Sequence, residues 1–383
     1  MRIDLKAELE ALVPPGRRAG TRPLPASPIG CLAFDPTGRH LAIGLAGHAP
    51  RVFVRELPGP EGKRESYRLD HTYDGAFFLA DDDDLEDENP ATDFGFFSCF
   101  ASSFSPDGRF LAVQHANPNH GNVVDVNLEI YDRVRGHLAV GVGPRDEEGP
   151  GNALGVSTYT WMAPGPAGVG MVVASFDGGI SLWRLSPRAS VRPIVRPVDV
   201  EVPPVLAVAV DTAGTRLAVV RAGALELRDI INVNAPASRL ELGVDPTAGG
   251  HVTARFIRDH VLIAWAEDGD AMILVVDLLS GNVDRIELGL EGVLGATLID
   301  LSGGSVLWER EEEGPGGTRR VLVRQQLLGG DTRPIQRGEG FGGLGGGHEG
   351  ALAVSPDGSR VARAVGATIV ISRIKTKRRK RSR

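Results

Sequence analysis

Residues Ser103–Val113 read SFSPDGRFLAV, and close variants of this stretch occur three more times in the chain. The variants are FDPTGRHLAI at Phe34–Ile43, VDTAGTRLAV at Val210–Val219 and VSPDGSRVAR at Val354–Arg363. In each copy a short apolar run leads into a turn, and a second run of alternating apolar residues follows. In SPDG, the proline suits the second turn position because its ring fixes φ, and the glycine tolerates a left-handed backbone. The repeat therefore predicts a β-hairpin that the chain uses several times.

Length and composition favour one large all-β domain. The chain has 383 residues, with 50 Gly and 26 Pro. Its apolar runs are short, which suits many brief strands joined by turns. None of these runs could span a bilayer, and the first 20 residues carry charges where a signal peptide needs an apolar stretch. We therefore expect a cytoplasmic location.

The cysteine and arginine contents add two expectations. Cys31 and Cys99 lie in apolar, strand-like runs, so we expect buried thiols and not a disulfide or metal framework. Arginine outnumbers lysine by 37 to 5. Together with the many Ala, Gly and Pro residues, this bias favours a GC-rich genome, and we expect a bacterial one.

Charge is distributed unevenly along the chain. The formal net charge is −7, and the last nine residues, KTKRRKRSR, contribute +7, which leaves −14 on the rest. Phosphate binding needs clustered cations, so an acidic body of this kind is a poor surface for nucleic acid. The sequence thus predicts an acidic body with one basic appendage.

Each hairpin is followed by a third strand-like run and often by a fourth. LEIYDRVRGHLAV at Leu128–Val140 and ILVVDLLSGNVDRIEL at Ile273–Leu288 both show a strand, an Asp, a Gly-containing turn and another strand. SFDGGISLWRL at Ser175–Leu185 has a DG turn and an aromatic residue near the end of its third strand, and GGHEGALAVSPDG at Gly346–Gly358 has a Gly-His pair before its first strand. The repeating unit is therefore about four strands long.

These units resemble the blades of the WD-repeat β-propellers, which carry Gly-His, a DG turn and a Trp-Asp or similar dipeptide at this spacing. The resemblance covers roughly Ser27–Ile374. Tyr131-Asp132 and Val276-Asp277 stand where the family has Trp-Asp. The resemblance also implies that blades are braced by a polar network, of which this chain retains Ser175, Asp177, Trp183, His251 and His348.

Markers that end the third strand give the expected number of blades. They fall near Arg55, Asp132, Arg184, Asp229, Asp277, Arg324 and Arg373. We therefore predict an all-β fold with a single seven-bladed β-propeller over residues 27–374. Six or eight blades are alternatives, because the blade at Val293–Gln336 has weak motifs. The family closes its propeller with an N-terminal strand, so we assign that role to residues 1–26, with Arg17–Leu24 as the candidate strand.

Catalytic signatures are scarce. The chain has no phosphate-binding GxxxxGK loop, no GxSxG elbow and no HExxH. GFGGLG at Gly340–Gly345 precedes strand sequence, whereas a dinucleotide site requires a helix there. His115 and His120 could be two metal ligands, but no third ligand follows at an obvious spacing. We predict no catalytic residue, no metal site and no cofactor.

Loop lengths point to a partner-binding face. If the strands run as in the family, four long loops lie on one face, conventionally the top: Ala80–Phe94, Gln114–Asn127, Glu311–Gly317 and Gly338–Gly347. Loops on a rigid scaffold are where function collects. The acidic run DDDDLEDE lacks the Gly of a compact calcium loop, so we interpret it as a solvated surface. The candidate partner-binding residues are Asp81, Asp82, Asp83, Asp84, Glu86, Asp87, Glu88, His115, Asn117 and His120.

Two functions remain open at this stage. The first is a non-enzymatic scaffold that binds one or more proteins on the top face, as a subunit of a hetero-complex. The second is a propeller enzyme, such as a metal-dependent hydrolase or lactonase, with a site at the central channel.

The basic tail at residues 375–383 has no apolar residue, so it should be disordered when alone. Its cations could bind nucleic acid, an anionic membrane or an acidic protein, or the tail could be a passive, solubilising terminus. The candidate anion-binding residues are Lys375, Lys377, Arg378, Arg379, Lys380, Arg381 and Arg383.

Overall fold

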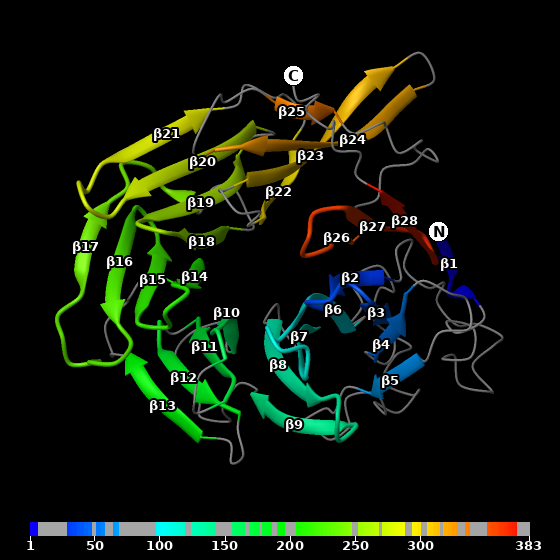
Figure 1. Ribbon diagram of the computed structural model, residues 1–383, viewed down its shortest axis with the longest axis horizontal. Coiled ribbons are helices and arrows are strands. Elements are labelled where there is room, and N and C mark those ends of the chain that lie inside the picture. The colour runs from blue at the N-terminus through cyan, green and yellow to red at the C-terminus, as the bar shows by residue number, and fades with distance from the viewer. Residues whose placement is uncertain are drawn as a thin grey trace, which may run out of the picture. The chain divides into compact units, whose positions relative to one another are not determined.

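The computed structural model of the chain describes residues 1–6, 29–47, 51–57, 64–68, 97–118, 124–142, 155–164, 168–176, 178–185, 190–195, 204–246, 252–267, 270–287, 293–299, 305–314, 317–327, 334–337 and 351–373. These residues form 28 strands, numbered β1 to β28 along the chain (Figure 1). The strands build five sheets of four strands and one sheet of eight. Within the described residues, none of the helical segments has the length and apolar character needed to cross a membrane.

Contacts divide the chain into two compact units, and the first holds β1 to β9 with most of β26 to β28. Its larger sheet has the order β5-β4-β3-β6-β7-β8-β9, with β2 paired to β3, and its smaller sheet has the order β1-β28-β27-β26. The strands of the larger sheet are β2 (Ile29–Phe34), β3 (His40–Gly47), β4 (Arg51–Glu56), β5 (Arg64–Arg68), β6 (Phe97–Phe104), β7 (Phe110–Pro118), β8 (Val124–Asp132) and β9 (His137–Val142). Those of the smaller sheet are β1 (Arg2–Asp4), β26 (Leu352–Val354), β27 (Arg360–Val365) and β28 (Thr368–Arg373).

The eight-stranded sheet contains two successive sets of four antiparallel strands. Strands β2 to β5 pair in chain order, and so do β6 to β9. A short antiparallel pairing of β3 with β6 joins the two sets, with Ala46 opposite Ser98 and Gly47 opposite Phe97. The larger sheet is therefore two repeats of the four-stranded unit, connected by two residue pairs.

The second unit holds nearly all of the strands from β10 to β25, in four sheets that each follow chain order. The first two sheets are β10 (Val156–Trp161), β11 (Gly170–Ser175), β12 (Ile180–Arg184) and β13 (Ser190–Val195), then β14 (Ala207–Val210), β15 (Arg216–Arg221), β16 (Ala224–Asp229) and β17 (Ser238–Glu241). The next two are β18 (Thr253–Ile257), β19 (His260–Glu267), β20 (Asp270–Asp277) and β21 (Val283–Glu287), then β22 (Val293–Ile299), β23 (Ser305–Gly314), β24 (Gly317–Gln326) and β25 (Pro334–Arg337).

The repeated sequence forms the turn between the first and second strands of four units, so the predicted hairpins are confirmed. The first residue of each turn is buried, and its side-chain oxygen accepts a hydrogen bond of 2.8–3.0 Å from the backbone N–H five residues later. The glycine at the fourth position has a φ of 64° to 73°, a backbone conformation that disfavours other residues. These first residues are Asp35, Ser105, Asp211 and Ser355, and the glycines are Gly38, Gly108, Gly214 and Gly358.

Apolar residues that alternate along the strands fill the space between sheets. In the first unit, Cys31, Ala33 and Val52 of the first strand set belong to one core cluster with Leu111 and Val113 of the second. In the second unit, a core around the fully buried Trp265 includes residues from β14 to β20. The sheets that share these clusters therefore bury apolar side chains against one another, and the hydrophobic effect is the main source of stability.

An N-terminal strand completes the last sheet, and it lies within residues 1–26, the segment to which we assigned this role. Arg2, Ile3 and Asp4 of β1 pair antiparallel with Val370, Ile369 and Thr368 of β28. The candidate strand Arg17–Leu24 lies outside the described residues, and the strand in this position is β1. The physical reason is the alternation at the N-terminus: Ile3 and Leu5 are both buried in the core that contains Ile369 and Ile371.

Candidate functional site

Most of the predicted partner-binding and anion-binding residues lie outside the described residues. This applies to the acidic residues between Asp81 and Glu88, to His120 and to the tail residues from Lys375 to Arg383. Asn117 lies in β7, opposite Asp125 of β8. The role of these residues in binding therefore stays a prediction.

His115 does not lie on a loop surface, and this corrects our expectation. Strands β7 and β8 extend to Pro118 and back from Val124, so most of the expected loop Gln114–Asn127 is strand. The His115 side chain is 1% exposed. It points to the same face of the sheet as Asn127 and Cys99, the residues opposite it in the two neighbouring strands. A polar histidine in a long hairpin thus belongs to the interior.

A buried polar cluster surrounds His115. The His115 Nε2 atom lies 3.7 Å from Glu129 Oε2, and the Tyr131 hydroxyl donates a hydrogen bond of 2.6 Å to the same carboxylate oxygen. All three side chains are buried. A buried carboxyl group without a hydrogen-bond partner is destabilising, and the Tyr131 hydroxyl supplies that partner to Glu129.

The two cysteines border this cluster, and the prediction of buried, free thiols is confirmed. Burial raises the pKa of Cys31 to about 11 and also raises the pKa of Cys99. Gly44 lies between them: a Cβ atom on Gly44 would overlap Cys31 Sγ and stand 2.8 Å from Cys99 Cβ. Protonated, buried thiols are poor nucleophiles and poor metal ligands. No group of three potential ligands suited to a metal ion occurs among the described residues.

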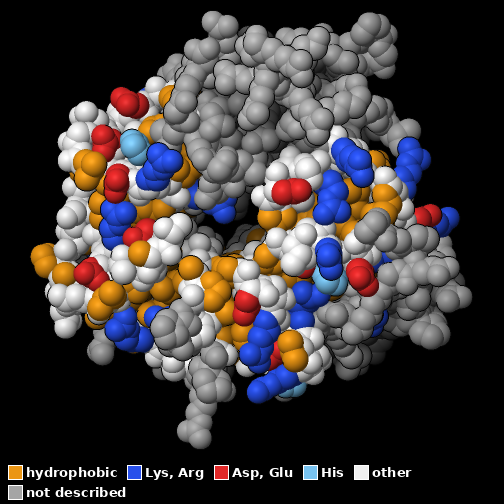
Figure 2. Space-filling view, in the orientation of Figure 1, with side chains coloured by type: hydrophobic (Ala, Val, Ile, Leu, Met, Phe, Trp, Pro, Cys, Tyr) orange, Lys and Arg blue, Asp and Glu red, His pale blue; other side chains and the backbone are white. Residues whose placement is uncertain are grey.

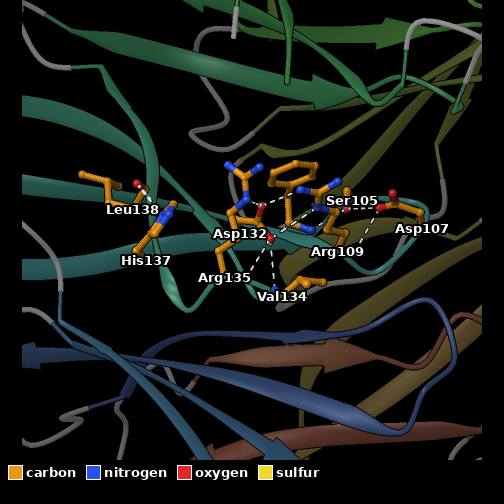
Figure 3. A network of polar contacts seen from close by, with 9 residues as sticks. Ser105, Asp107, Arg109, Asp132, Val134, Arg135, His137 and Leu138 are labelled. Atoms are coloured by element: carbon orange, nitrogen blue, oxygen red, sulfur yellow. Dashed lines mark hydrogen bonds and ion pairs between the residues drawn. The ribbon is translucent and has the colours of Figure 1, made fainter. Parts of the chain in front are cut away.

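In the first unit, a network of polar contacts joins the turn between β6 and β7 to the turn between β8 and β9. Figure 3 shows Asp132 at the end of β8 facing Arg109 from the turn between β6 and β7. Arg109 donates from Nη2 to Asp132 Oδ2 at 2.7 Å and from Nε to Oδ1 at 3.3 Å. The backbone N–H groups of Val134 and Arg135 donate to Oδ1 at 3.0 and 3.3 Å. One carboxylate therefore links two turns.

The electrostatics of Asp132 follow from these contacts. Burial alone would raise the pKa of this carboxyl group, but the hydrogen bonds from Arg109 and from the Arg135 and Val134 amides outweigh it and lower the pKa. The Arg109 guanidinium correspondingly has a raised pKa, chiefly because of its hydrogen bond to Asp132. This pair is fixed and charged near neutral pH, so its role is structural.

The same aspartate cap recurs at two turns of the second unit. Asp229 Oδ1 accepts hydrogen bonds from the amides of Ile231 and Asn232 at 2.7 and 2.8 Å. Asp277 Oδ1 accepts from the amide of Leu279 at 2.8 Å. Hydrogen bonds within this last turn lower the pKa of Asp277, the bond from Leu279 being the largest contribution. Each cap fixes the backbone of the residue two positions later.

That residue is an exposed aliphatic side chain in all three turns. Val134 is 78% exposed, Ile231 is 69% exposed and Leu279 is 81% exposed. We call these three residues the turn tips. Among the described residues, the exposed large hydrophobic side chains are these three together with Met1 and Val191. The three turns thus share both the aspartate cap and an exposed aliphatic side chain two residues after it.

The turn tips were missed by the sequence reasoning, although the chain contains a signal for them. DRV, DII and DLL each place an aliphatic residue two positions after the aspartate that ends a third strand. Turn positions of this kind normally carry polar residues.

Figure 2 shows basic, acidic and hydrophobic side chains interspersed on the face of the molecule in view. Of the predicted bracing residues, Trp183 donates from Nε1 to Ser181 at 2.8 Å, and Ser175 donates to the Gly179 carbonyl at 3.2 Å. Asp177, His251 and His348 lie outside the described residues.

Comparisons with known proteins identify the fold. No protein-family model matches the chain, and no curated protein matches it. In contrast, 685 chains of solved structures match, which is how a widely used fold behaves. One of them is the Dos1 propeller, with a TM-score of 0.56 and 10% sequence identity, over 91% of this chain and 93% of that chain. At this identity the likeness shows the fold alone, and the chain is a β-propeller protein.

Proposed function

We propose that this protein is a non-enzymatic scaffold that binds other proteins, as a subunit of a cytoplasmic complex. The observation that carries the proposal is the set of turn tips: Val134, Ile231 and Leu279 occupy the same position in three turns and are all exposed. Burial of exposed aliphatic side chains is favourable, so turns that hold them rigidly in water offer apolar area to a binding partner.

The use of the carboxylates supports a scaffold over an enzyme. Asp35, Asp132 and Asp211 are buried, and each accepts several hydrogen bonds that shape a turn. Catalytic carboxylates must instead be available to a substrate or a metal ion. In the part of the chain that the structure describes, these three buried carboxylates accept hydrogen bonds from the backbone and side chains of the turns around them.

We further propose that the propeller has seven blades of the WD-repeat type. The two strand sets β2 to β5 and β6 to β9 then count as separate blades, despite the two residue pairs between β3 and β6. The five four-stranded sheets supply the others. The Asp that ends the third strand at Asp132, Asp229 and Asp277 supports the assignment, since it matches the second residue of the Trp-Asp dipeptide.

Photo-cross-linking tests the proposed function. A photoreactive phenylalanine analogue is placed singly at Val134, Ile231 or Leu279 in the native host, and cross-linked proteins are identified by mass spectrometry. Val191, which is 52% exposed but lies in strand β13, is the matched control position. We expect discrete protein cross-links from the turn tips and only background from Val191. Equal, diffuse labelling from all four positions would contradict a protein-binding role for the tips.

A further inference from the structure

The turn tip of the first unit stands among cations. Val134 is flanked in the chain by Arg133 and Arg135, and the Arg135 side chain is exposed. Arg109 also lies beside this turn, held by the buried Asp132 carboxylate. Asp132 is covered, whereas the guanidinium groups of Arg109 and Arg135 remain accessible. The exposed Asp107 carboxylate belongs to the Arg109 turn as well. Three guanidinium groups against this one exposed carboxylate give the aliphatic Val134 a rim with an excess of positive charge.

The two turn tips of the second unit belong to one local surface. The amide of Ile230 donates to the Thr215 carbonyl, and the neighbouring Arg216 lies 3.8 Å from Asp259. Asp259 in turn accepts, through its carbonyl, a hydrogen bond from the amide of Leu278. The turn of Leu279 also lies against strand β17, because a Cβ atom on Gly281 would be 3.7 Å from Leu240 Cδ2. A continuous chain of contacts thus connects Ile231 with Leu279.

Carboxylates predominate on this second surface. Asp229 and Asp277 cap its turns, and Asp259 and Asp284 lie at the same end of the strands. Three guanidinium groups are also present: Arg216 is paired with Asp211 and Asp259, Arg192 donates to the Ile230 carbonyl, and Arg258 is exposed. The carboxylates outnumber the guanidinium groups, so the rim around Ile231 and Leu279 is negative.

We propose that a second copy of this chain binds at this surface, with the Val134 turn of one copy seated between the Ile231 and Leu279 turns of another. The proposal rests on the protein-binding role of the turn tips and names their partner. Its basis is complementarity: one chain carries both an aliphatic tip with a positive rim and an aliphatic pair with a negative rim. Charges of opposite sign speed the encounter and fix its orientation, and aliphatic burial stabilises the contact.

The expected association is weak and depends on salt. Three aliphatic side chains and a few exposed charges must offset the loss of translational and rotational freedom, which limits such a contact to a dissociation constant of roughly micromolar size or weaker. Exposed charges are screened beyond about 10 Å at 0.1 M salt, so the association should weaken as salt rises.

Sedimentation velocity of the purified full chain, over a concentration series at low salt, tests the proposal. We expect concentration-dependent self-association of the wild type. Val134→Ser alone, or Ile231→Ser with Leu279→Ser, should raise the dissociation constant at least about tenfold, since each removes one side of the aliphatic contact. Val191→Ser is the matched control, because it removes an exposed aliphatic group outside the turns, and it should behave like the wild type.

Charge reversal supplies a second, more specific readout. Arg135→Glu and Asp259→Arg should each weaken self-association, and a mixture of the two variants should associate again, because each then supplies the partner that the other lost. A wild type that stays monomeric at about 100 μM and low salt overturns the proposal, and so does equal association of all variants. If cross-links from the turn tips then lead to other proteins, the scaffold function stands and only the second copy is excluded.

Discussion

The Asp132 carboxylate connects two turns that are separated by more than twenty residues in the chain. It accepts hydrogen bonds from Arg109 in one turn and from the Val134 and Arg135 amides in the other. Asp132→Ala removes all of these acceptors and leaves the amides to solvent. We expect a loss of stability of roughly 1–3 kcal/mol, the range for a hydrogen-bonded charged group.

Urea denaturation followed by circular dichroism measures this effect. Asp284→Ala is the control, since Asp284 is an exposed aspartate of β21 and caps no turn. The control should unfold at the same urea concentration as the wild type. A midpoint for Asp132→Ala that coincides with that of the control would mean that the cap contributes nothing.

The Asp357 carboxyl group, in the turn that begins at Ser355, makes the stability of the fold depend on pH. Hydrogen bonds lower its pKa from 3.8 to about 2, first that from the Ser355 hydroxyl and then those from Ser359. A carboxyl group whose pKa is lower in the folded state stabilises the fold above its unfolded pKa and loses that contribution as pH falls through the folded value. Its contribution is therefore complete near neutral pH and disappears between about pH 4 and pH 2.

Comparing wild type with Asp357→Asn across this pH range tests the assignment. The difference in thermal stability should be largest near neutral pH, should shrink as pH falls from about 4 to 2, and should vanish below about pH 2, where Asp357 is protonated in the folded state as well. The lowered pKa values of Asp35, Asp132 and Asp211 act in the same direction for the whole protein. A stability difference that stays constant from pH 7 to pH 2 would show that the charge of Asp357 is irrelevant to the fold.

At the scale of single residues, the sequence predicts backbone geometry better than side-chain surroundings. The turn glycines and the first residue of each turn can be predicted from the sequence, because few residue types tolerate those positions. The contact of Arg109 with Asp132 cannot be predicted in this way, because it joins two turns that come together only through the pairing of β7 with β8. His115 shows the same limit: its polarity suggests a surface, whereas its strand places it opposite Cys99 in the interior.

Among the elements, β1 is a strand that is too short to be predicted from its sequence pattern. It has three residues, too few to show a clear alternation of apolar and polar residues. The longer segment Arg17–Leu24 was therefore the candidate for the closing strand. What determines its place is tertiary: Ile3 enters a core formed by β2, β3, β27 and β28. A contact between chain ends cannot be deduced from local propensity.

Ile3→Asp should open the edge of the last sheet. The carboxylate would replace a side chain that is 4% exposed, and burying an unpaired charge there is strongly unfavourable. Hydrogen exchange should accelerate at the β28 amides that face β1, at least about tenfold if the local opening energy falls by 1.4 kcal/mol. Arg2→Asp is the control, because Arg2 is exposed and its side chain lies on the other face of β1. Equal exchange in both variants would contradict a stabilising role for Ile3.

For the whole molecule, composition and repeats predict an all-β fold of repeated hairpins, and the resemblance to WD-repeat blades added the propeller. Short apolar runs, frequent glycine and four copies of one hairpin indicate the repeated strands, and the likeness to the Dos1 propeller agrees with the propeller that the resemblance implied. The number of blades is harder to read, because one sheet joins two repeats through β3 and β6. Partner-binding residues are harder still, since propellers place unrelated functions on similar scaffolds.

Charge at the scale of the whole chain leads to the last prediction, which concerns residues 375–383. Seven cations in nine residues stand against a net charge of −14 on the rest of the chain, given the total of −7. A cationic segment attached to an acidic body can attract polyanions while the body repels them, so the tail alone should carry any such binding. We expect the full chain to bind single-stranded RNA, duplex DNA or phosphatidylserine vesicles at 50 mM salt, and a chain without residues 375–383 to bind none of them.

Salt dependence and a sequence control make this prediction specific. If all seven cations contact duplex DNA, the logarithm of the binding constant should fall with the logarithm of salt with a slope of about −6, and fewer contacts give a proportionally smaller slope. A tail with the same composition in scrambled order should bind equally well, because charge density and not sequence is recognised. Replacement of the seven cations by Gln should abolish binding without changing the unfolding midpoint. Absence of binding by the full chain to all three probes at 50 mM salt would exclude a polyanion as the partner and leave an acidic protein surface or a passive terminus.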